Sequence, residues 1–237
     1  MKRHYFRINQ TIATIIVEEK YLLVIEREVL TLRQELENYV LENPLFLASL
    51  EPCDIRVDAP DIVKLMAISA KRAGVGPMAS VAGAIAYHAV AAAVDAGADH
   101  IIFDNGGDIA LFINKPIVVG IYAGDLGIKG LGFKVIPREE IIGICTSSGT
   151  IGPSLSFGNA DAATVISEDV ILADALATAL GNAVTKTDNE SIVTEMENLV
   201  TYGIEGMLVL VEDKLAIWGV LPRIVKANVD YSLITKA

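Results

Sequence analysis

The chain is poor in positive charge, aromatic side chains and cysteine. Aromatic residues make up 6% of its 237 residues, and 30 aspartates and glutamates outnumber 19 lysines and arginines, for a net charge of −11. Because nucleic-acid binding needs clustered lysine and arginine to neutralise phosphates, the sequence predicts no nucleic-acid partner. The two cysteines, Cys53 and Cys145, are far apart and lack metal-ligand spacing. They argue against a disulfide framework and are typical of a reducing cytoplasm.

A long apolar run is also missing, although 52% of the residues are hydrophobic and the mean hydropathy is +0.47. The longest weakly polar run covers residues 78–94; Ser80 and His88 interrupt it, and Asp95 ends it. It is shorter than the roughly twenty apolar residues of a membrane span and is rich in alanine. It therefore predicts a buried helix and no membrane partner.

The basic N-terminus is followed by a β-branched run without a small-residue cleavage site, so a signal peptide is not expected. Together with the cysteine usage, this predicts a cytoplasmic protein. The apolar surplus predicts that some surface is covered in a homo-oligomer, with a dimer as the simplest form.

The common catalytic motifs are absent. There is no Walker loop, no G-x-G-x-x-G before a helix, no H-E-x-x-H and no G-x-S-x-G. Cys145 ends an apolar run without a neighbouring histidine or lysine, which favours a buried hydrophobe over a nucleophile. His88 lies in the alanine-rich segment, where we expect a hydrogen-bonded core residue.

The apolar periodicity predicts strands and helices in alternation. Residues 11–28 read as two strands around a polar turn, and helical spacing then predicts a helix that Pro44 interrupts. Two further helices are expected, one between Pro60 and Gly74 and one over residues 79–96.

The second half predicts more strands. Two strands flank the glycine turn of "DNGGDI", and residues 116–124, 141–150 and 160–166 read as single strands. Residues 125–140 read as a loop or irregular edge, Ser167 as the cap of a helix, and residues 205–220 as a hairpin after a polar helix. The expected fold is one α+β domain over residues 1–237, with antiparallel sheets packed against helices.

The glycine turn is the first candidate for binding chemistry. Gly106 and Gly107 permit positive φ and close approach of a ligand to the backbone, and Asp104 and Asp108 flank them. The alternative is an ordinary hairpin turn with acidic residues, because Asn-Gly is a strong turn signal.

The segment "CTSSGT" is the second candidate. Thr146, Ser147 and Ser148 precede Gly149, and consecutive hydroxyl and N–H groups at a strand end bind phosphate or a carbonyl-bearing ring. The alternative is a plain serine- and glycine-rich turn. The small, uncharged run continues through "GPSLSFGN", which is longer than a tight turn needs and favours a ligand loop.

The third candidate is "ADALATA", where Asp174 and Thr178 are four residues apart and share one helix face. Carboxylate and hydroxyl oxygens are hard ligands, which suit Mg²⁺ or Ca²⁺ once carbonyls, waters or phosphates complete the shell. In the alternative, Asp174 serves the N-terminal half of its own helix and Thr178 bonds back to a carbonyl one turn earlier.

Taken together, "VGPMASVAGAIA", "DNGGDI", "CTSSGTIGPSLSFGNADAATVI" and "LADALATALGN" resemble the signatures of the uncharacterised ApbE-like family UPF0280. That family is distantly similar to the ApbE flavin transferases, which take FAD, use Mg²⁺ and attach FMN to a threonine of a target protein. The resemblance implies an ApbE-like fold. It also implies a ligand site at Gly106, Gly107, Asp108, Thr146, Ser147 or Ser148, and Gly149, with a metal at Asp174 and Thr178.

The "GGIAKG" segment of ApbE enzymes falls near residues 78–83. Gly83 fits this segment and joins the predicted ligand site, while Ala82 stands at the lysine position and Tyr87 near the expected acid. The histidine-containing loop of those enzymes is replaced by "GPSLSFGN".

Three functions follow from the sequence. The first is binding of a phosphate-bearing small molecule with Mg²⁺, with FAD or another flavin nucleotide as the candidate ligand and a transferase-like activity. The second is an accessory role without flavin in sulfur assimilation towards homocysteine, which the resemblance implies and Ala82 favours. The third is an interaction protein that kept an ancestral fold without catalysis.

Overall fold

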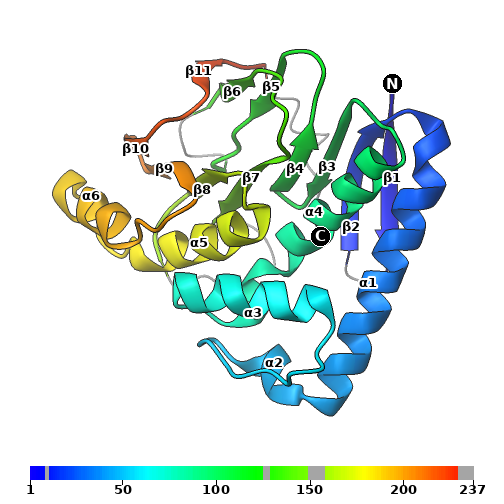
Figure 1. Cartoon of the computed structure of the whole chain (residues 1–237). Helices are drawn as coiled ribbons and strands as arrows, with labels where there is room; N and C mark the ends of the chain where they lie inside the picture. The colour runs from blue at the N-terminus through cyan, green and yellow to red at the C-terminus, as the bar shows by residue number, and fades with distance from the viewer. Residues whose placement is uncertain (9–10, 125–128, 149–157, 229–237) are drawn as a thin grey trace.

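A computed structural model describes residues 1–8, 11–124, 129–148 and 158–228. These residues form two antiparallel sheets with helices packed against the larger one (Figure 1). The α+β fold expected from the sequence is therefore confirmed.

The larger sheet carries most of the site and has eight described strands in the order β1-β2-β3-β4-β7-β8-β9-β10. Each strand pairs antiparallel with its neighbour. The strands are β1 (Lys2–Ile8), β2 (Thr11–Val17), β3 (Ile101–Asn105), β4 (Asp108–Phe112), β7 (Ile142–Ser147), β8 (Ala162–Ser167), β9 (Ile204–Val211) and β10 (Lys214–Gly219).

The smaller sheet lies against one face of the larger one. Its described strands are ordered β11 (Arg223–Lys226), β6 (Leu131–Val135) and β5 (Ile117–Gly120). Buried apolar side chains of both sheets, among them Leu111, Phe133, Ile142 and Leu208, form a separate core between them. The opposite face of the larger sheet contacts α4 and α5.

Several helices begin or end at the proline and glycine residues that the sequence indicates. They are α1 (Leu22–Glu42), α2 (Pro44–Ala48), α3 (Asp61–Ala73), α4 (Val81–Asp95), α5 (Val170–Ala183) and α6 (Asn189–Asn198), with 3-10 turns η1 (Glu19–Tyr21) and η2 (Pro77–Ser80). Pro44 separates α1 from α2, and Gly74 ends α3 with a left-handed φ of 70°.

Three predictions of local structure were wrong. Residues 22–28 begin the long helix α1 instead of a second strand, because Ile25, Val29 and Leu32 are buried at helical spacing. Residues 131–135 form strand β6 within the segment read as a loop. Asp169 caps α5 by accepting the Leu172 amide, while Ser167 accepts the amide of Asp169.

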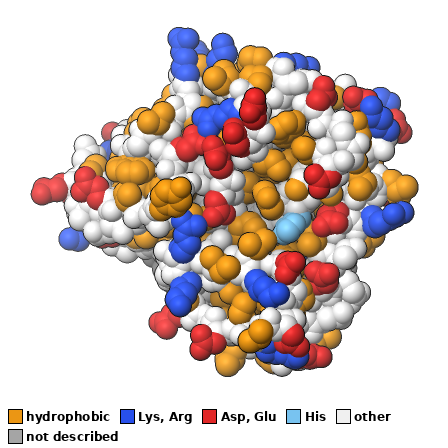
Figure 2. Space-filling model, viewed as in Figure 1, with side chains coloured by type: hydrophobic (Ala, Val, Ile, Leu, Met, Phe, Trp, Pro, Cys, Tyr) orange, Lys and Arg blue, Asp and Glu red, His pale blue; other side chains and the backbone are white. Residues whose placement is uncertain are grey.

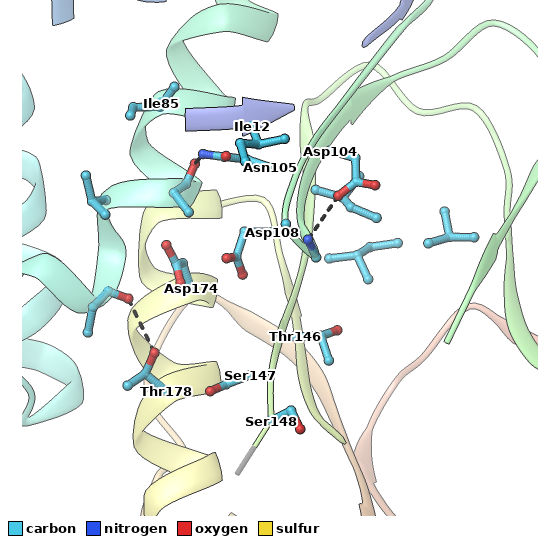
Figure 3. A pocket seen from close by; sticks show the side chains of 18 of the residues that line it. Ile12, Ile85, Asp104, Asn105, Asp108, Thr146, Ser147, Ser148, Asp174 and Thr178 are labelled. Atoms are coloured by element: carbon cyan, nitrogen blue, oxygen red, sulfur yellow. Dashed lines mark hydrogen bonds between the residues drawn. The ribbon is translucent and has the colours of Figure 1, made fainter. Parts of the chain in front are cut away.

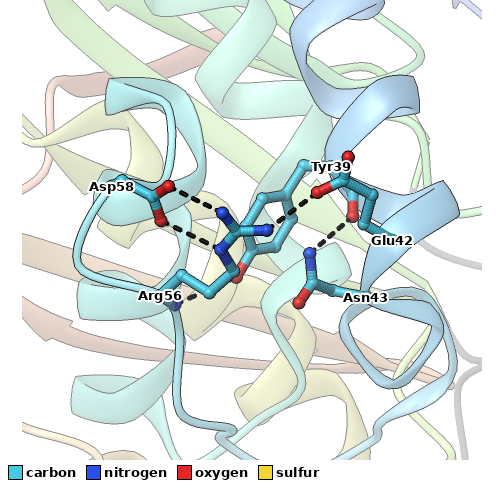
Figure 4. Close-up of polar contacts among 5 residues, drawn as sticks. All are labelled: Tyr39, Glu42, Asn43, Arg56 and Asp58. Atoms are coloured by element: carbon cyan, nitrogen blue, oxygen red, sulfur yellow. Dashed lines mark hydrogen bonds and ion pairs between the residues drawn. The ribbon is translucent and has the colours of Figure 1, made fainter.

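The connection between α1 and α3 is fixed by a polar cluster around Arg56 (Figure 4). The Arg56 guanidinium pairs with both carboxylate oxygens of Asp58, at 2.6 and 2.9 Å, and with Glu42 at 2.8 Å. The Arg56 amide donates to the Tyr39 hydroxyl, and Asn43 Nδ2 donates to the Tyr39 carbonyl. These contacts tie the end of α1 to the segment that leads into α3.

Helix α4 explains the most apolar stretch of the sequence. Residues Pro77–Asp95 are long and apolar enough to cross a membrane, but about half of this stretch is buried within the fold. The core helix of a globular domain has the same length and composition, and α4 contacts α1, α5, β3 and β4. His88 on this helix is half-buried, and its Nε2 has no hydrogen-bond partner among the described residues, contrary to the expectation.

Hydrophobic side chains lie between charged ones on the helical face (Figure 2). Leu23 and Leu30 of α1 and Ile68 of α3 are each more than half exposed. That a second copy of the chain covers such side chains in a homo-oligomer stays a prediction.

The contact between α4 and α5 is tight at Gly83. A Cβ at Gly83 would lie 2.7 Å from the Asp174 Cβ and 2.9 Å from the Val170 carbonyl oxygen. Backbone and a buried side chain cannot give way by that amount without moving a helix. Gly83 therefore sets how closely the two helices approach.

We expect Gly83→Ala to lower the free energy of unfolding by about 1–3 kcal/mol, because overpacking outweighs the gain in helix propensity of about 1 kcal/mol. Urea denaturation of both proteins measures the change. An unchanged or raised midpoint would contradict the tight contact, because helix propensity alone predicts stabilisation.

Candidate functional site

The site is built around Asp174, which reaches from α5 to the first turn of α4. Its side chain is only 6% exposed, and its Oδ2 accepts the Gly83 amide at 2.7 Å. Small residues allow this approach: Ala173 and Ala177 beside Asp174 are fully buried. Asp174 thus accepts a hydrogen bond from an amide at the start of a neighbouring helix, where the helix dipole also stabilises a carboxylate.

Thr178 lies one turn further along α5 and also faces the start of α4. Its Oγ1 is 3.5 Å from the Ala79 carbonyl oxygen, to which it donates. This hydrogen bond joins Thr178 to a residue outside α5. Thr178 therefore does not form the hydrogen bond to a carbonyl of its own helix that the sequence allowed as an alternative. The Asp174 carboxylate, the Thr178 hydroxyl and the Ala79 carbonyl bring hard oxygen donors to one corner of the fold (Figure 3).

The double-glycine turn closes the second side of this corner. Gly106 and Gly107 have φ of 73° and 107°, which L side chains rarely adopt. Asp104 Oδ1 accepts the Gly107 amide at 3.0 Å, and Asn105 Nδ2 donates to the Ala82 carbonyl at 3.1 Å. The turn is therefore fixed both within itself and to the first turn of α4.

Asp108 follows the turn on β4 and lies opposite Cys145 of β7. In Figure 3 its carboxylate faces that of Asp174. Burial, and then the negative charges of Asp174 and Asp104, raise the pKa of Asp108 well above its ordinary value. Hydrogen bonds from the Thr146 backbone and the Cys145 side chain oppose this shift.

Asp174 is shifted in the same direction. Burial raises its pKa to about 7, although the amides of Gly83 and Ala82 oppose the change. Among the described residues, neither carboxylate forms an ion pair with a lysine, an arginine or a histidine. Two facing carboxyl groups without a positive partner favour binding of a proton or a cation.

The end of β7 supplies the hydroxyl groups. Thr146 Oγ1 is hydrogen-bonded to Thr164 Oγ1 at 2.9 Å, and the Thr146 amide donates to the Gly107 carbonyl. Ser147 and Ser148 line the same cleft as Thr146. Gly149 lies outside the described residues. Cys145 is fully buried, and burial raises the pKa of its thiol well above the ordinary value, in keeping with a structural role.

These groups line one cleft of about 2380 Å³ among the described residues. The predicted site residues in its wall are Gly106, Gly107, Asp108, Thr146, Ser147, Ser148, Asp174 and Thr178. Gly83 is not among the lining residues; it is buried behind Asp174 and acts through its amide. The described residues contain no cluster of three or more histidine, cysteine, aspartate or glutamate side chains that could hold a metal.

Sequence reasoning missed two parts of the site. Asn105 was read only as a turn residue, and its bond to Ala82 joins segments 23 residues apart. The Ala79 carbonyl is a backbone group, which residue types do not reveal. The place of Asn105 directly before the double glycine was the one feature of the sequence that could have indicated its role in the site.

The comparisons with known proteins agree on the relationship. The family model described as "AbpE bacteria" matches residues 8–201. A UPF0280 protein of Methanocella arvoryzae is 50% identical over 98% of this chain and 94% of its own length. A UPF0280 protein of Archaeoglobus fulgidus is 43% identical over the full length of both chains.

One solved structure supports the fold. The apo form of the flavinyl transferase ApbE from Pseudomonas stutzeri superposes with a TM-score of 0.56 and covers 94% of this chain and 95% of its own. Its sequence identity is 14%, so the likeness concerns the fold alone. With the matching family model and the relatives of 43–50% identity, this chain belongs to the UPF0280 family of ApbE-like proteins.

Proposed function

We propose that this protein binds a phosphate-bearing small molecule together with Mg²⁺, and that a flavin nucleotide is the leading candidate for the ligand. The facing carboxyl groups of Asp108 and Asp174 are the observation that carries the proposal. Both have raised pKa values and neither gains a positive partner among the described residues. A divalent cation would favour their charged forms.

The donors at this corner fit magnesium. Asp174, Thr178 and the Ala79 carbonyl offer oxygen atoms only, and Mg²⁺ prefers oxygen and usually keeps several waters. One or two carboxylates are enough for such a site when a phosphate completes the shell. Bound there, Mg²⁺ would neutralise phosphate charge that the acidic corner otherwise repels.

The glycine turn and the end of β7 suit the phosphate itself. The Gly106 position is open, because an added Cβ there would meet no described atom within 4 Å. A ligand can therefore approach this backbone closely, and the hydroxyls of Ser147 and Ser148 line the cleft beside it. The flavin assignment draws support from the ApbE-like family and from a neighbour of related fold that is a flavinyl transferase.

The cleft also favours a ligand over the interaction-protein alternative, because the described side chains leave about 2380 Å³ unfilled. A cytoplasmic location and a homodimer complete the proposal. Both rest on the composition of the chain: two isolated cysteines and a high apolar content.

We expect saturating Mg²⁺ to raise the free energy of unfolding by about 2–3 kcal/mol at a hundredfold excess over the dissociation constant. Asp174→Asn and Thr178→Val should lose most of this gain, because each removes one donor. Thermal unfolding with Mg²⁺ or EDTA measures it. Thr194→Val removes an exposed threonine on α6 and serves as the matched control. An equal gain in all four proteins would show that Mg²⁺ acts elsewhere.

The metal-free protein should lose stability as the pH rises, through Asp174. Its folded pKa of about 7 lies above the ordinary value of 3.8, so between these values the folded state holds a proton that the unfolded chain has released. Relative to Asp174→Asn, the wild type should therefore lose about 1–4 kcal/mol between pH 4 and pH 7. The variant also removes the charge that raises the pKa of Asp108, which acts in the same direction.

Urea denaturation of both proteins in EDTA at several pH values provides the measurement. If the two stability curves run parallel from pH 4 to pH 8, Asp174 does not carry a raised pKa in the folded state.

The functional proposal is tested by titrating the protein with FAD and with FMN in Mg²⁺ and in EDTA, followed by flavin fluorescence and calorimetry. We expect a dissociation constant of tens of micromolar or lower with Mg²⁺ and binding weakened at least tenfold by Asp174→Ala, about 1.4 kcal/mol. Absence of binding to either nucleotide, with Asp174→Ala indistinguishable from wild type, would refute the flavin assignment.

A further inference from the structure

Strand β10 forms one end of the larger sheet, and one edge of its backbone is unpaired among the described strands (Figure 1). Proteins protect such edges with charged side chains, prolines or bulges, because an open edge pairs readily with a strand of another molecule. Strand β1 at the opposite end of the sheet is protected in this way, since it carries Lys2, Arg3 and Arg7. The six residues of β10 contain no proline, and Lys214 at one end is the single charged residue among them.

Two apolar side chains of β10 continue the core between the two sheets and are left uncovered. Leu208 and Leu210 of β9 are at most 1% exposed in that core. Their partners on β10, Ile217 and Leu215, lie on the same face of the sheet but are 45% and 40% exposed. The smaller sheet therefore covers β9 and stops short of β10. The opposite face of β10 packs against the main core and contacts α6.

The pairing with β9 determines which backbone groups of β10 remain available. A two-residue turn joins the two strands, and the residues that close such a turn, here Lys214 and its partner, exchange both hydrogen bonds. At the other end of the ladder, the Val220 amide donates to the Glu205 carbonyl at 2.8 Å. Even-numbered residues thus bond to β9. The N–H and C=O groups of Leu215 and Ile217 therefore point to the open edge.

We infer that β10 pairs antiparallel with β10 of a second copy of the chain, about a two-fold axis at Ala216. In this register Leu215 of each copy lies opposite Ile217 of the other, and each such pair exchanges two hydrogen bonds. Each pair also covers the two apolar side chains that the smaller sheet leaves open. The inference rests on the homodimer proposed above and names its contact surface, and it does not depend on the ligand.

The backbone selects this register among those that keep matching faces together. A register centred on Ile217 would place Leu215 opposite Gly219, whose φ is 74°, whereas an antiparallel strand has a φ of about −140°. A register centred on Leu215 would place Ile217 opposite Asp213, which belongs to the turn. The register centred on Ala216 uses only residues that already pair with β9.

The charges at this edge also fit a second copy. In the inferred register the charged residues Glu212, Asp213 and Lys214 all lie opposite uncharged residues of the other copy. Strand β1 does not share this property. Paired with itself about its middle residue, it would place Arg3 opposite Arg7, and like charges directly opposite one another are destabilising.

Light scattering and sedimentation of the full chain test the inference. The wild type should have twice the chain mass of 25.3 kDa. Ile217→Lys should raise the dissociation constant of the dimer at least about tenfold, because it brings a charge into the paired edge. Ile68→Lys is the matched control: it makes the same change at an isoleucine of α3 that is 55% exposed, and it should leave the mass unchanged.

Thermal unfolding checks that both variants fold. Neither position lines the cleft formed by the described residues, so both variants should bind Mg²⁺ and flavin nucleotides as the wild type does. The titrations described above therefore measure the proposed ligand binding separately from the dimer contact.

Cysteine cross-linking tests the register. The two copies of Ala216 would form a non-hydrogen-bonded pair with Cα atoms about 4.5 Å apart, which a disulfide can bridge. In a Cys53→Ser background with oxidised glutathione, Ala216→Cys should give a covalent dimer on a non-reducing gel. Tyr5→Cys, at a position that is 69% exposed on the opposite edge strand, should give none.

Three outcomes would overturn the inference. A wild type with the mass of one chain refutes it together with the homodimer. A dimer that survives Ile217→Lys but is lost in Ile68→Lys refutes the β10 contact alone and assigns the contact to the helical face. A covalent dimer of Tyr5→Cys in place of Ala216→Cys assigns it to β1.

Discussion

The bond from the Gly83 amide to the Asp174 carboxylate holds the site together. It spans 91 residues of sequence and joins α4 to α5 at a point where an added methyl group would not fit. The same carboxyl group faces Asp108 on β4, so one buried ionisable group lies between the helical layer and the sheet. Burying it is costly unless it is paired or neutralised. The fold keeps Asp174 in a position that packing alone does not require.

Each of the hydrogen bonds around this contact involves at least one backbone group. The Asn105 side chain donates to the Ala82 carbonyl, the Asp104 side chain accepts a hydrogen bond from the Gly107 amide, and the Thr146 amide donates to the Gly107 carbonyl. These contacts pre-organise a turn with left-handed backbone beside an acidic corner. The result combines a place for a cation with a backbone that a ligand can approach closely.

Local signals predicted much of the fold. Pro44 and Gly74 bounded helices as expected, and the double glycine joined two strands. Two of the three failures have a common cause: residues 22–28 and 131–135 are short apolar runs whose periodicity fits strand, helix or loop until their partners are known. Ile25 became helical because the length of α1 allowed its apolar face to pack against α4.

The sequence by itself determined the chemistry of the parts: small residues, hard oxygen donors on one face of α5, a double-glycine turn and hydroxyls after an apolar run. Family membership follows from those motifs and their order. Only the tertiary structure decided that Asp174 meets Gly83 and faces Asp108, and that the Ala79 carbonyl lies beside Thr178. These contacts depend on how closely two helices and a strand end approach. That distance is set by packing across the whole core and leaves no local trace in the sequence.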